Sequence, residues 1–232
     1  MSTLHLIRHG QASFGAGDYD RLSLLGHRQA GLTGDFLAAS GQPLAVAFCG
    51  EMLRQRQSAQ DALAAWPEPT ELVVLPQFNE YPFEQMVEIF APVLAAESPE
   101  WAQAAQELEQ DPHQYMRVFR EALARWLAGE TPSPKLESSD AFAARVAEGL
   151  ALAATRLGRG TIGAVFTSGG PIAMLVARSL GLDKPAMMAL NLVMRNSSIT
   201  SFICGQGRHT LLSFNSAAHL EQQREPDLVT QR

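Results

Sequence analysis

Short apolar runs alternate along the chain with longer stretches in which apolar residues recur every three or four positions. Short runs of this kind are typical of buried strands, and the longer spacing is typical of helices. Helical spacing covers Leu25 to Ala39 and residues 116–127. Strands that alternate with helices predict an α/β fold with a largely parallel sheet. The expected strands are Thr3–Arg8, Leu44–Cys49, Glu71–Leu75, Thr161–Thr167, Ser197–Cys204 and His209–Phe214.

Two segments depart from this alternation. The last two strands are separated only by the letters GQGR, which predicts a hairpin. Residues from about 81 to 137 hold helical segments without a convincing strand and end in the loop TPSPK. We interpret them as a helical insertion over one edge of the sheet, part of a lid within a single domain of residues 1–232. After the loop, Ser139 and Asp140 are expected to cap a helix that runs to about Leu157.

Composition narrows the class of protein. The chain has 232 residues, 46% of them hydrophobic, and a net charge of −6. This charge gives no general attraction to nucleic acid or to an anionic membrane, and no apolar run is long enough to span a bilayer. Two cysteines, Cys49 and Cys204, do not make a disulfide framework, and no signal peptide is visible, so we expect a cytoplasmic protein with reduced thiols.

Candidate chemistry follows the first strand, in the letters LIRHGQAS. Ligands bind beyond the carboxyl ends of the strands in open α/β sheets, and Arg8, His9 and Gly10 should lie there. A buried guanidinium is costly unless an anion or a carboxylate partners it. The alternative interpretation is a hydrogen-bonded structural histidine at a tight turn.

The next two strands place further polar residues at the same rim. Arg54 lies in the first turn of the helix predicted after the second strand, and Arg56 points to another side because each residue advances the helix by about 100°. Arg54 is therefore the candidate anion ligand, and Arg56 is expected on a solvated face. The third strand leads into PQFNEYPFEQ, which brings either Glu80 or Glu84 to this rim.

A glycine-rich turn follows the fourth strand, in the letters IGAVFTSGGPIAML. Ser168, Gly169 and Gly170 lead into a helix for which Pro171 suits the first position. A junction of strand, glycine-rich turn and helix binds anions, because backbone amides and the helix dipole both point at it. Together the four strand ends favour phosphoryl transfer. The sequence has no dinucleotide-binding fingerprint, no P-loop lysine and no metal-ligand spacing, so we expect neither cofactor nor metal.

The blocks LIRHGQA, LSLLGHRQA, GEMLRQRQSA, NE and TSGGPI together resemble the histidine phosphatase superfamily of phosphoglycerate mutase-like proteins. The resemblance implies a three-layer α/β/α sandwich whose mostly parallel sheet has one antiparallel strand. It also implies a metal-independent phosphomonoesterase with a phosphohistidine intermediate on His9. By the same resemblance Arg8 and Arg54 hold the phosphoryl group and Glu80 donates the proton. We expect Gly10, Ser168, Gly169 and Gly170 to help to bind this group.

Independent physical reasons support the role of His9. An imidazole attacks phosphorus through an unprotonated nitrogen, so its other nitrogen should donate to a backbone carbonyl. The neighbouring Arg8 should disfavour the imidazolium form.

The sequence departs from the family at Ser168, where the resemblance implies a second histidine. A serine can still donate one neutral hydrogen bond to a phosphoryl oxygen, although a charge-assisted bond is about twice as strong. Ser168 could alternatively cap the helix that Pro171 begins, or do both. His219 is the candidate for a substitute donor, and its alternative is an ordinary residue of a loop or helix start.

A second departure is the short segment QASFGAGDYDR, with Phe14 and Gly15, between the first two blocks. Mutase-type members carry a longer segment there, so the short one favours a phosphatase over a phosphoglycerate mutase. We therefore expect a phosphatase that acts on a small-molecule or peptide phosphoester. The alternative from another class is a phosphate-binding or regulatory module that keeps the pocket without useful turnover.

Overall fold

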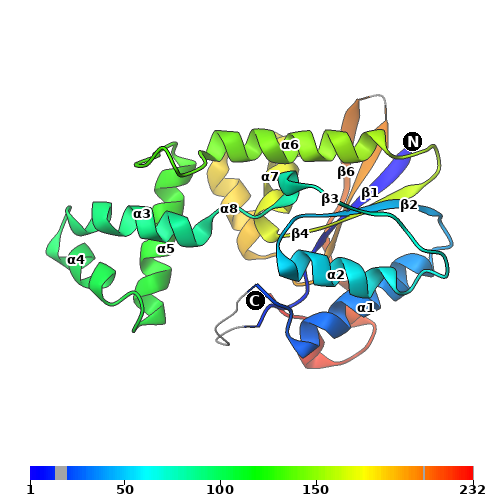
Figure 1. Cartoon of the computed structure of the whole chain (residues 1–232), viewed down its shortest axis with the longest axis horizontal. Helices are drawn as coiled ribbons and strands as arrows, with labels where there is room; N and C mark the ends of the chain where they lie inside the picture. Colours follow the sequence, from blue (N-terminus) through cyan, green and yellow to red (C-terminus); the bar gives the residue numbers. More distant parts are fainter. Residues whose placement is uncertain (14–19, 206, 232) are drawn as a thin grey trace. The chain divides into compact units, whose positions relative to one another are not determined.

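The computed structural model describes residues 1–13, 20–205 and 207–231, and the chain divides into two compact units (Figure 1). The sheet unit comprises Met1–Asn79 and Arg145–Arg232, and the helical unit comprises Glu80–Ala144. The positions that the sequence singled out at Phe14 and Gly15 lie outside the described residues. Each unit is described by itself below.

The sheet unit is built on six strands in the order β3-β2-β4-β1-β5-β6. The pairs of β1 with β4, β4 with β2 and β2 with β3 are parallel, whereas β5 runs antiparallel to both β1 and β6. The predicted α/β fold with a mostly parallel sheet and one reversed strand is confirmed, as is the hairpin, in which Gly205 pairs with Arg208. The strands are β1 Ser2–Arg8, β2 Leu44–Cys49, β3 Leu72–Val74, β4 Ile162–Thr167, β5 Ile199–Gly205 and β6 Arg208–Ser216.

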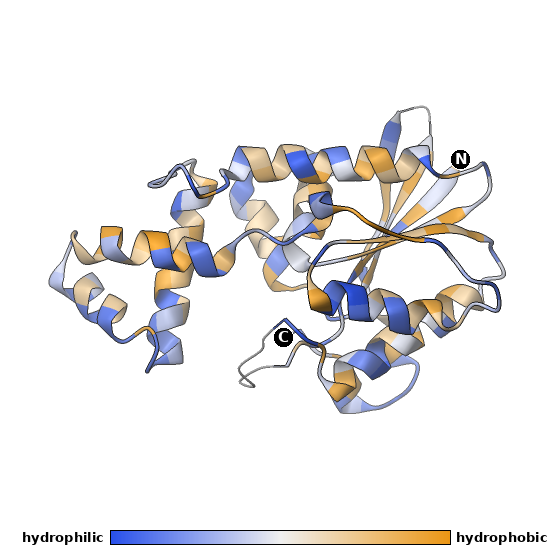
Figure 2. Cartoon of the chain, viewed as in Figure 1, coloured by the Kyte–Doolittle hydropathy of each residue, from blue (hydrophilic) through white to orange (hydrophobic). Residues whose placement is uncertain are grey.

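Helices cover both faces of this sheet. Alternate strand residues, among them Ile7, Ala47 and Phe166, pack in one cluster with Leu37 of α1 and Ala59 of α2. Side chains one position along each strand point to the opposite face, where α7 packs on β1 and β6 (Figure 1). The central strands are accordingly apolar (Figure 2). The helices of this unit are α1 Leu24–Ala38, α2 Leu53–Leu63, α7 Gly169–Leu180, α8 Lys184–Leu192 and α9 Ala218–Glu221, with 3₁₀ turns at Pro76–Phe78 and Pro226–Leu228.

The helical unit contains α3 Phe83–Ala95, α4 Pro99–Gln106, α5 Pro112–Leu127 and the start of α6 Ser139–Thr155, as the sequence predicts for this region. Its own core includes the aromatic rings of Tyr81, Trp126 and Phe142, whose centroids lie 5.7 to 5.9 Å apart. The capping prediction was wrong by one residue. The hydroxyl of Ser138, not Ser139, accepts from the Ala141 amide, because only Ser138 stands three residues before that amide. The lid role of this unit remains a prediction.

Both cysteines are unpaired and buried. Burial raises the pKa of Cys49, at the end of β2, to about 11, although the charge of Arg56 opposes the shift.

Within the described part of the chain, none of the helices is long and apolar enough to cross a bilayer.

The packing of α1 on α2 requires a glycine at position 34. A Cβ added at Gly34 would lie 2.1 Å from the backbone oxygen of Ala62, whereas a Cβ at Gly31 of the same helix meets nothing within 4 Å. We predict that Gly34→Ala lowers the free energy of unfolding by about 1–3 kcal/mol, because α1 must move away from α2.

Gly31→Ala is the matched control, expected to raise the free energy of unfolding by about 0.5–1 kcal/mol through helix propensity. Urea unfolding of both variants measures these changes. Equal effects in the two variants would contradict the close approach of α1 and α2.

Candidate active site

The carboxyl ends of β1, β2, β3 and β4 lie at the same end of the sheet, because these four strands are parallel. This end of the sheet is called the site edge below. The backbone of His9, after β1, donates to the carbonyl of Thr167 in β4 at 2.8 Å. Gly50, after β2, donates to the Phe166 carbonyl at 3.3 Å, and Leu75, after β3, donates to the Cys49 carbonyl at 2.8 Å. The residues that the sequence predicted after β1, β2 and β4 therefore meet at the site edge.

The orientation of the His9 ring is defined by two hydrogen bonds. Its Nδ1 lies 2.7 Å from the carbonyl oxygen of Gly10, and since a carbonyl can only accept, Nδ1 carries the hydrogen. Its Nε2 is then unprotonated and accepts from Nε of Arg54 at 3.3 Å. The ring is 5% exposed. Its lone pair therefore points at the cation that was expected to hold a phosphoryl group.

The surroundings of His9 favour the neutral imidazole. Burial is the largest cause that holds its pKa well below 6.5, followed by the charges of Arg54 and Arg8. The hydrogen bond to the Gly10 carbonyl acts in the opposite direction, and it does not restore the ordinary pKa. The expectation that Arg8 disfavours the imidazolium agrees with this order of causes, in which desolvation is the stronger effect.

Gly10 is required by the close approach of two backbones. A Cβ at Gly10 would lie 2.3 Å from the carbonyl oxygen of Gly26 in the first turn of α1. The amide of Gly10 donates to the hydroxyl of Ser58 at 3.0 Å, and this hydroxyl donates to the Arg54 carbonyl at 2.7 Å. The turn after β1 is thus fixed against both α1 and α2.

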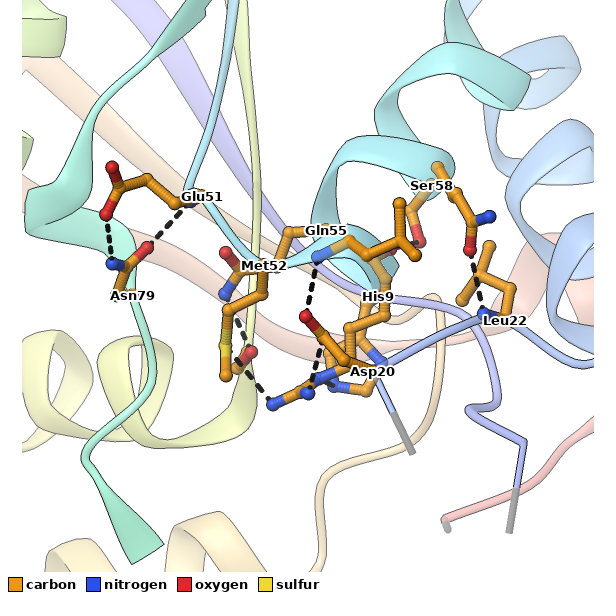
Figure 3. A network of polar contacts seen from close by, with 12 residues as sticks. His9, Asp20, Leu22, Glu51, Met52, Gln55, Ser58 and Asn79 are labelled. Carbon is orange, nitrogen blue, oxygen red and sulfur yellow. Dashed lines mark hydrogen bonds and ion pairs between the residues drawn. The ribbon is translucent and has the colours of Figure 1, made fainter. Parts of the chain in front are cut away.

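Arg54 and Arg56 lie on different faces of α2, as the helical step predicts. Arg54 is the second residue of the helix and only 3% exposed, whereas Arg56 is exposed. Besides its contact with His9, the Arg54 guanidinium donates to Oδ1 of Asp20 at 2.8 Å and to Sδ of Met52 at 3.2 Å. Figure 3 shows Asp20, Met52 and His9 gathered around this point. An incoming anion must therefore exchange with contacts that the protein itself makes to Arg54.

Arg8 contacts backbone carbonyls in this structure. Its Nη1 donates to the carbonyl of Met194 and, at 2.9 Å, to that of Gln231. Its Nε is 3.9 Å from the point that a Cβ of Gly169 would occupy, so the side chain runs beside the start of α7.

The glycine-rich turn forms the start of α7. A Cβ at Gly169 would lie 2.4 Å from Oδ1 of Asn191, so a larger residue there would have to displace the Asn191 side chain. The helix α7 begins at Gly169, which makes Pro171 its third position rather than its first. Ser168 occupies the N-cap position, but its side chain makes no capping hydrogen bond. The Ser168 hydroxyl accepts instead from Nε2 of Gln55 at 2.8 Å.

A family comparison agrees with this arrangement. Residues 4–217 match the model of the histidine phosphatase superfamily, branch 1. The chain belongs to the histidine phosphatase superfamily. No curated protein matches it in a sequence search.

Solved structures of similar fold extend this comparison. Phosphoserine phosphatase from Entamoeba histolytica is 22% identical, with a TM-score of 0.61 and coverage of 95% of this chain and 100% of that one. Phosphoglycerate mutase from Bacillus anthracis is 19% identical, with a TM-score of 0.65 and coverage of 97% of both chains. Mycobacterial glucosyl-3-phosphoglycerate phosphatase is 21% identical, with a TM-score of 0.60 and coverage of 93% and 99%. These likenesses establish the shared fold.

The two carboxylates proposed for proton donation fall in the helical unit. Oε1 of Glu80 accepts from the Tyr81 amide at 3.1 Å, and Glu84 is exposed in the first turn of α3. In the sheet unit, the preceding Asn79 exchanges two hydrogen bonds with Glu51, at 2.7 and 2.8 Å (Figure 3). The choice of Glu80 over Glu84 remains a prediction.

His219 lies in a structural environment against α1. Its Nε2 lies 3.0 Å from the hydroxyl of Thr33, and its ring packs on Phe36, both in α1. Burial lowers its pKa to about 4, against the opposing influence of Ser197 and Glu221. These contacts agree with the alternative of an ordinary packed histidine and give no support to a substitute phosphoryl donor.

Sequence reasoning missed Asp20 and Gln55. Asp20 lies in a loop, and the sequence around a loop aspartate does not indicate which residue it pairs with. Gln55 lies in a helix with many polar residues, so its sequence position alone does not mark it as functional. The buried position of Gln55 was nevertheless available from the helical spacing, because it lies four and seven residues before the small apolar residues Ala59 and Ala62. Within the described ranges, no group of three His, Cys, Asp or Glu side chains could hold a metal ion.

The two arginines of α2 give a direct test of the site. We predict that Arg54→Ala weakens vanadate and inorganic phosphate binding at least about tenfold, because a charge-assisted hydrogen bond is worth roughly 1.5–3 kcal/mol. Arg56→Ala, the matched control on the exposed face, should change the affinity little. Calorimetric titration measures both, and equal losses would place the anion elsewhere.

Asp20 competes with an anion for Arg54. We predict that Asp20→Asn raises phosphate affinity about two- to fivefold, a small gain because the Asp20 side chain is 41% exposed and solvent screens the pair. Asp61→Asn is the control, because it removes a carboxylate of α2 that pairs with His27 of α1, and it should leave the affinity unchanged. A weaker affinity in Asp20→Asn would mean that Asp20 positions Arg54 rather than competing for it.

Proposed function

We propose that this member of the histidine phosphatase superfamily hydrolyses phosphate monoesters through a phosphohistidine intermediate on His9. The single observation that carries the proposal is the His9 ring, whose Nδ1 donates to Gly10 and whose unprotonated Nε2 faces Arg54 at 3.3 Å. A nucleophilic imidazole needs this tautomer at the pH of reaction.

The first chemical step transfers the phosphoryl group to the protein. Nε2 of His9 attacks phosphorus, the bond between phosphorus and the ester oxygen breaks, and Glu80 protonates the leaving oxygen. Arg54 holds the phosphoryl oxygens, with Arg8 moving from its carbonyl contacts to join it. Charge spreads over these oxygens in the transition state, so positioned cations lower the barrier. Water then attacks phosphorus and gives a proton to the Glu80 carboxylate, and the bond between phosphorus and Nε2 breaks. This step releases inorganic phosphate and restores the neutral ring and the protonated Glu80.

The substrate class is a small-molecule or peptide phosphoester. Phosphoserine phosphatase and glucosyl-3-phosphoglycerate phosphatase share the fold, and their names favour a small phosphorylated molecule. The local positive charge of Arg8 and Arg54 serves this purpose in a chain whose net charge is −6. Neither step uses a metal ion, and we propose cytoplasmic action.

A phosphate-binding or regulatory module is the second candidate. Ser168, where the family resemblance implies a histidine, favours it, since a neutral donor stabilises the transition state less than a charged one. Such a module would bind phosphate without forming phosphohistidine, so covalent trapping separates the two functions.

We predict that ³²P-labelled p-nitrophenyl phosphate labels the parent protein on His9 and that His9→Ala is neither labelled nor active. Labelling should fall off at a lower pH than the ordinary histidine pKa of about 6.5 would give, because the pKa of His9 is lowered and the ring stays neutral further into the acid range. Chelating agents should have no effect. His27→Ala, which removes a half-exposed histidine paired with Asp61, is the control and should be labelled like the parent. Phosphate binding without labelling in the parent would favour the regulatory module.

A further inference from the structure

Gln55 and Ser168 form a buried pair beside the proposed nucleophile. Both side chains are fully buried, and Nε2 of Gln55 lies 2.8 Å from the Ser168 hydroxyl. Gln55 directly follows Arg54 in α2, and Ser168 directly follows Thr167, whose carbonyl accepts from the His9 amide. The pair therefore joins the helix that carries the proposed phosphoryl ligand to the strand end beside His9.

The orientation of the Gln55 amide follows from its second partner. Nε2 also lies 3.1 Å from the carbonyl oxygen of Phe78, which can only accept, so the nitrogen end of the amide must face it. The same nitrogen then donates its other hydrogen to Ser168. The hydroxyl oxygen of Ser168 is thus an acceptor toward Gln55.

This arrangement leaves the single hydrogen of the Ser168 hydroxyl directed away from Gln55. Among the described residues, Ser168 makes no other side-chain hydrogen bond, and it does not cap α7. The N-cap position would ordinarily use that oxygen to accept from an amide of the helix. A donor without a protein acceptor at this strand end is suited to an oxygen of a bound anion.

Burial of the Gln55 amide has an unfavourable free energy that an apolar side chain at this position would not have. Its Oε1 is buried and finds no hydrogen-bond partner in the part of the chain that the structure describes, although buried polar atoms are usually paired. Space for this oxygen exists only because residue 50 is a glycine, where a Cβ would lie 2.0 Å from it.

We propose that Gln55 is a positioning residue that holds the Ser168 hydroxyl as a hydrogen-bond donor to a phosphoryl oxygen. The pair then supplies the contact that the family resemblance assigns to a second histidine. This inference rests on the proposed function. It predicts that Gln55 acts on catalysis only through Ser168.

A double-mutant cycle tests this dependence with p-nitrophenyl phosphate. Ser168→Ala should lower kcat roughly 10- to 30-fold, because it removes one neutral donor from the transition state. Gln55→Met keeps the length of the side chain without its amide, and should lower kcat about three- to tenfold, the range of a neutral hydrogen bond. The double variant should be no slower than Ser168→Ala. KM should change little throughout, because the contact tightens in the transition state.

The control pair is Gln55→Met with Ser179→Ala, an exposed serine of the same helix α7 that bonds only to the carbonyl of Val176 among the described residues. Here the effects on kcat should multiply. If Gln55→Met lowers kcat by the same factor with and without Ser168, the inference is wrong. Thermal unfolding of each variant checks that all are folded.

Gly50→Ala gives an independent variant that keeps Gln55. The added methyl displaces the amide oxygen, so kcat should fall in the parent and not fall further in Ser168→Ala.

Should the parent form no phosphohistidine, the proposed function fails. The same variants titrated with vanadate then decide the pairing, because vanadate binds as an analogue of the transferring group. Coupled losses of vanadate affinity would support the pair, and independent losses would overturn it.

Discussion

The site depends on the hydrogen bond from Nδ1 of His9 to the carbonyl of Gly10. This bond determines which ring nitrogen keeps its lone pair and where that lone pair points. It forms only because the chain turns immediately after β1, with Gly10 against the backbone of Gly26 and its amide on Ser58. The position of the His9 ring is therefore set by the packing of the turn after β1 against α1 and α2. Rotation of side chains alone cannot change this backbone packing.

Positive and negative side chains both lie near the His9 ring. Burial first, and then the charges of Arg54 and Arg8, hold the imidazole neutral. The buried guanidinium of Arg54 is itself unfavourable without a counter-charge. Asp20 supplies one, at 2.8 Å from Arg54, and its half-exposed position keeps that pairing weak enough to exchange. The protein thus carries an internal anion where a substrate anion is expected, and binding becomes a replacement of one anion by another.

Much of this site could be predicted from the sequence. What could not be predicted has a physical reason, which is that it depends on contacts between distant segments. Strand ends and helical step depend on local patterns, so His9, Gly10 and Arg54 were placed at one edge and Arg56 on the outside. Contacts between distant segments leave no such pattern, and the partners of Asp20 and Gln55 were missed for this reason. Ser168 is an intermediate case: its place at the helix start was predictable, while its partner, 113 positions away in the sequence, was not.

The burial of Cys49 has a consequence for how the protein withstands oxidants. Peroxides and alkylating reagents attack thiolates, and a pKa of about 11 keeps this sulfur in the thiol form at neutral pH. The cysteine stands one residue before Gly50, at the site edge like His9, yet offers no reactive sulfur there. The chemistry proposed for the imidazole at this edge therefore does not depend on keeping this sulfur reduced.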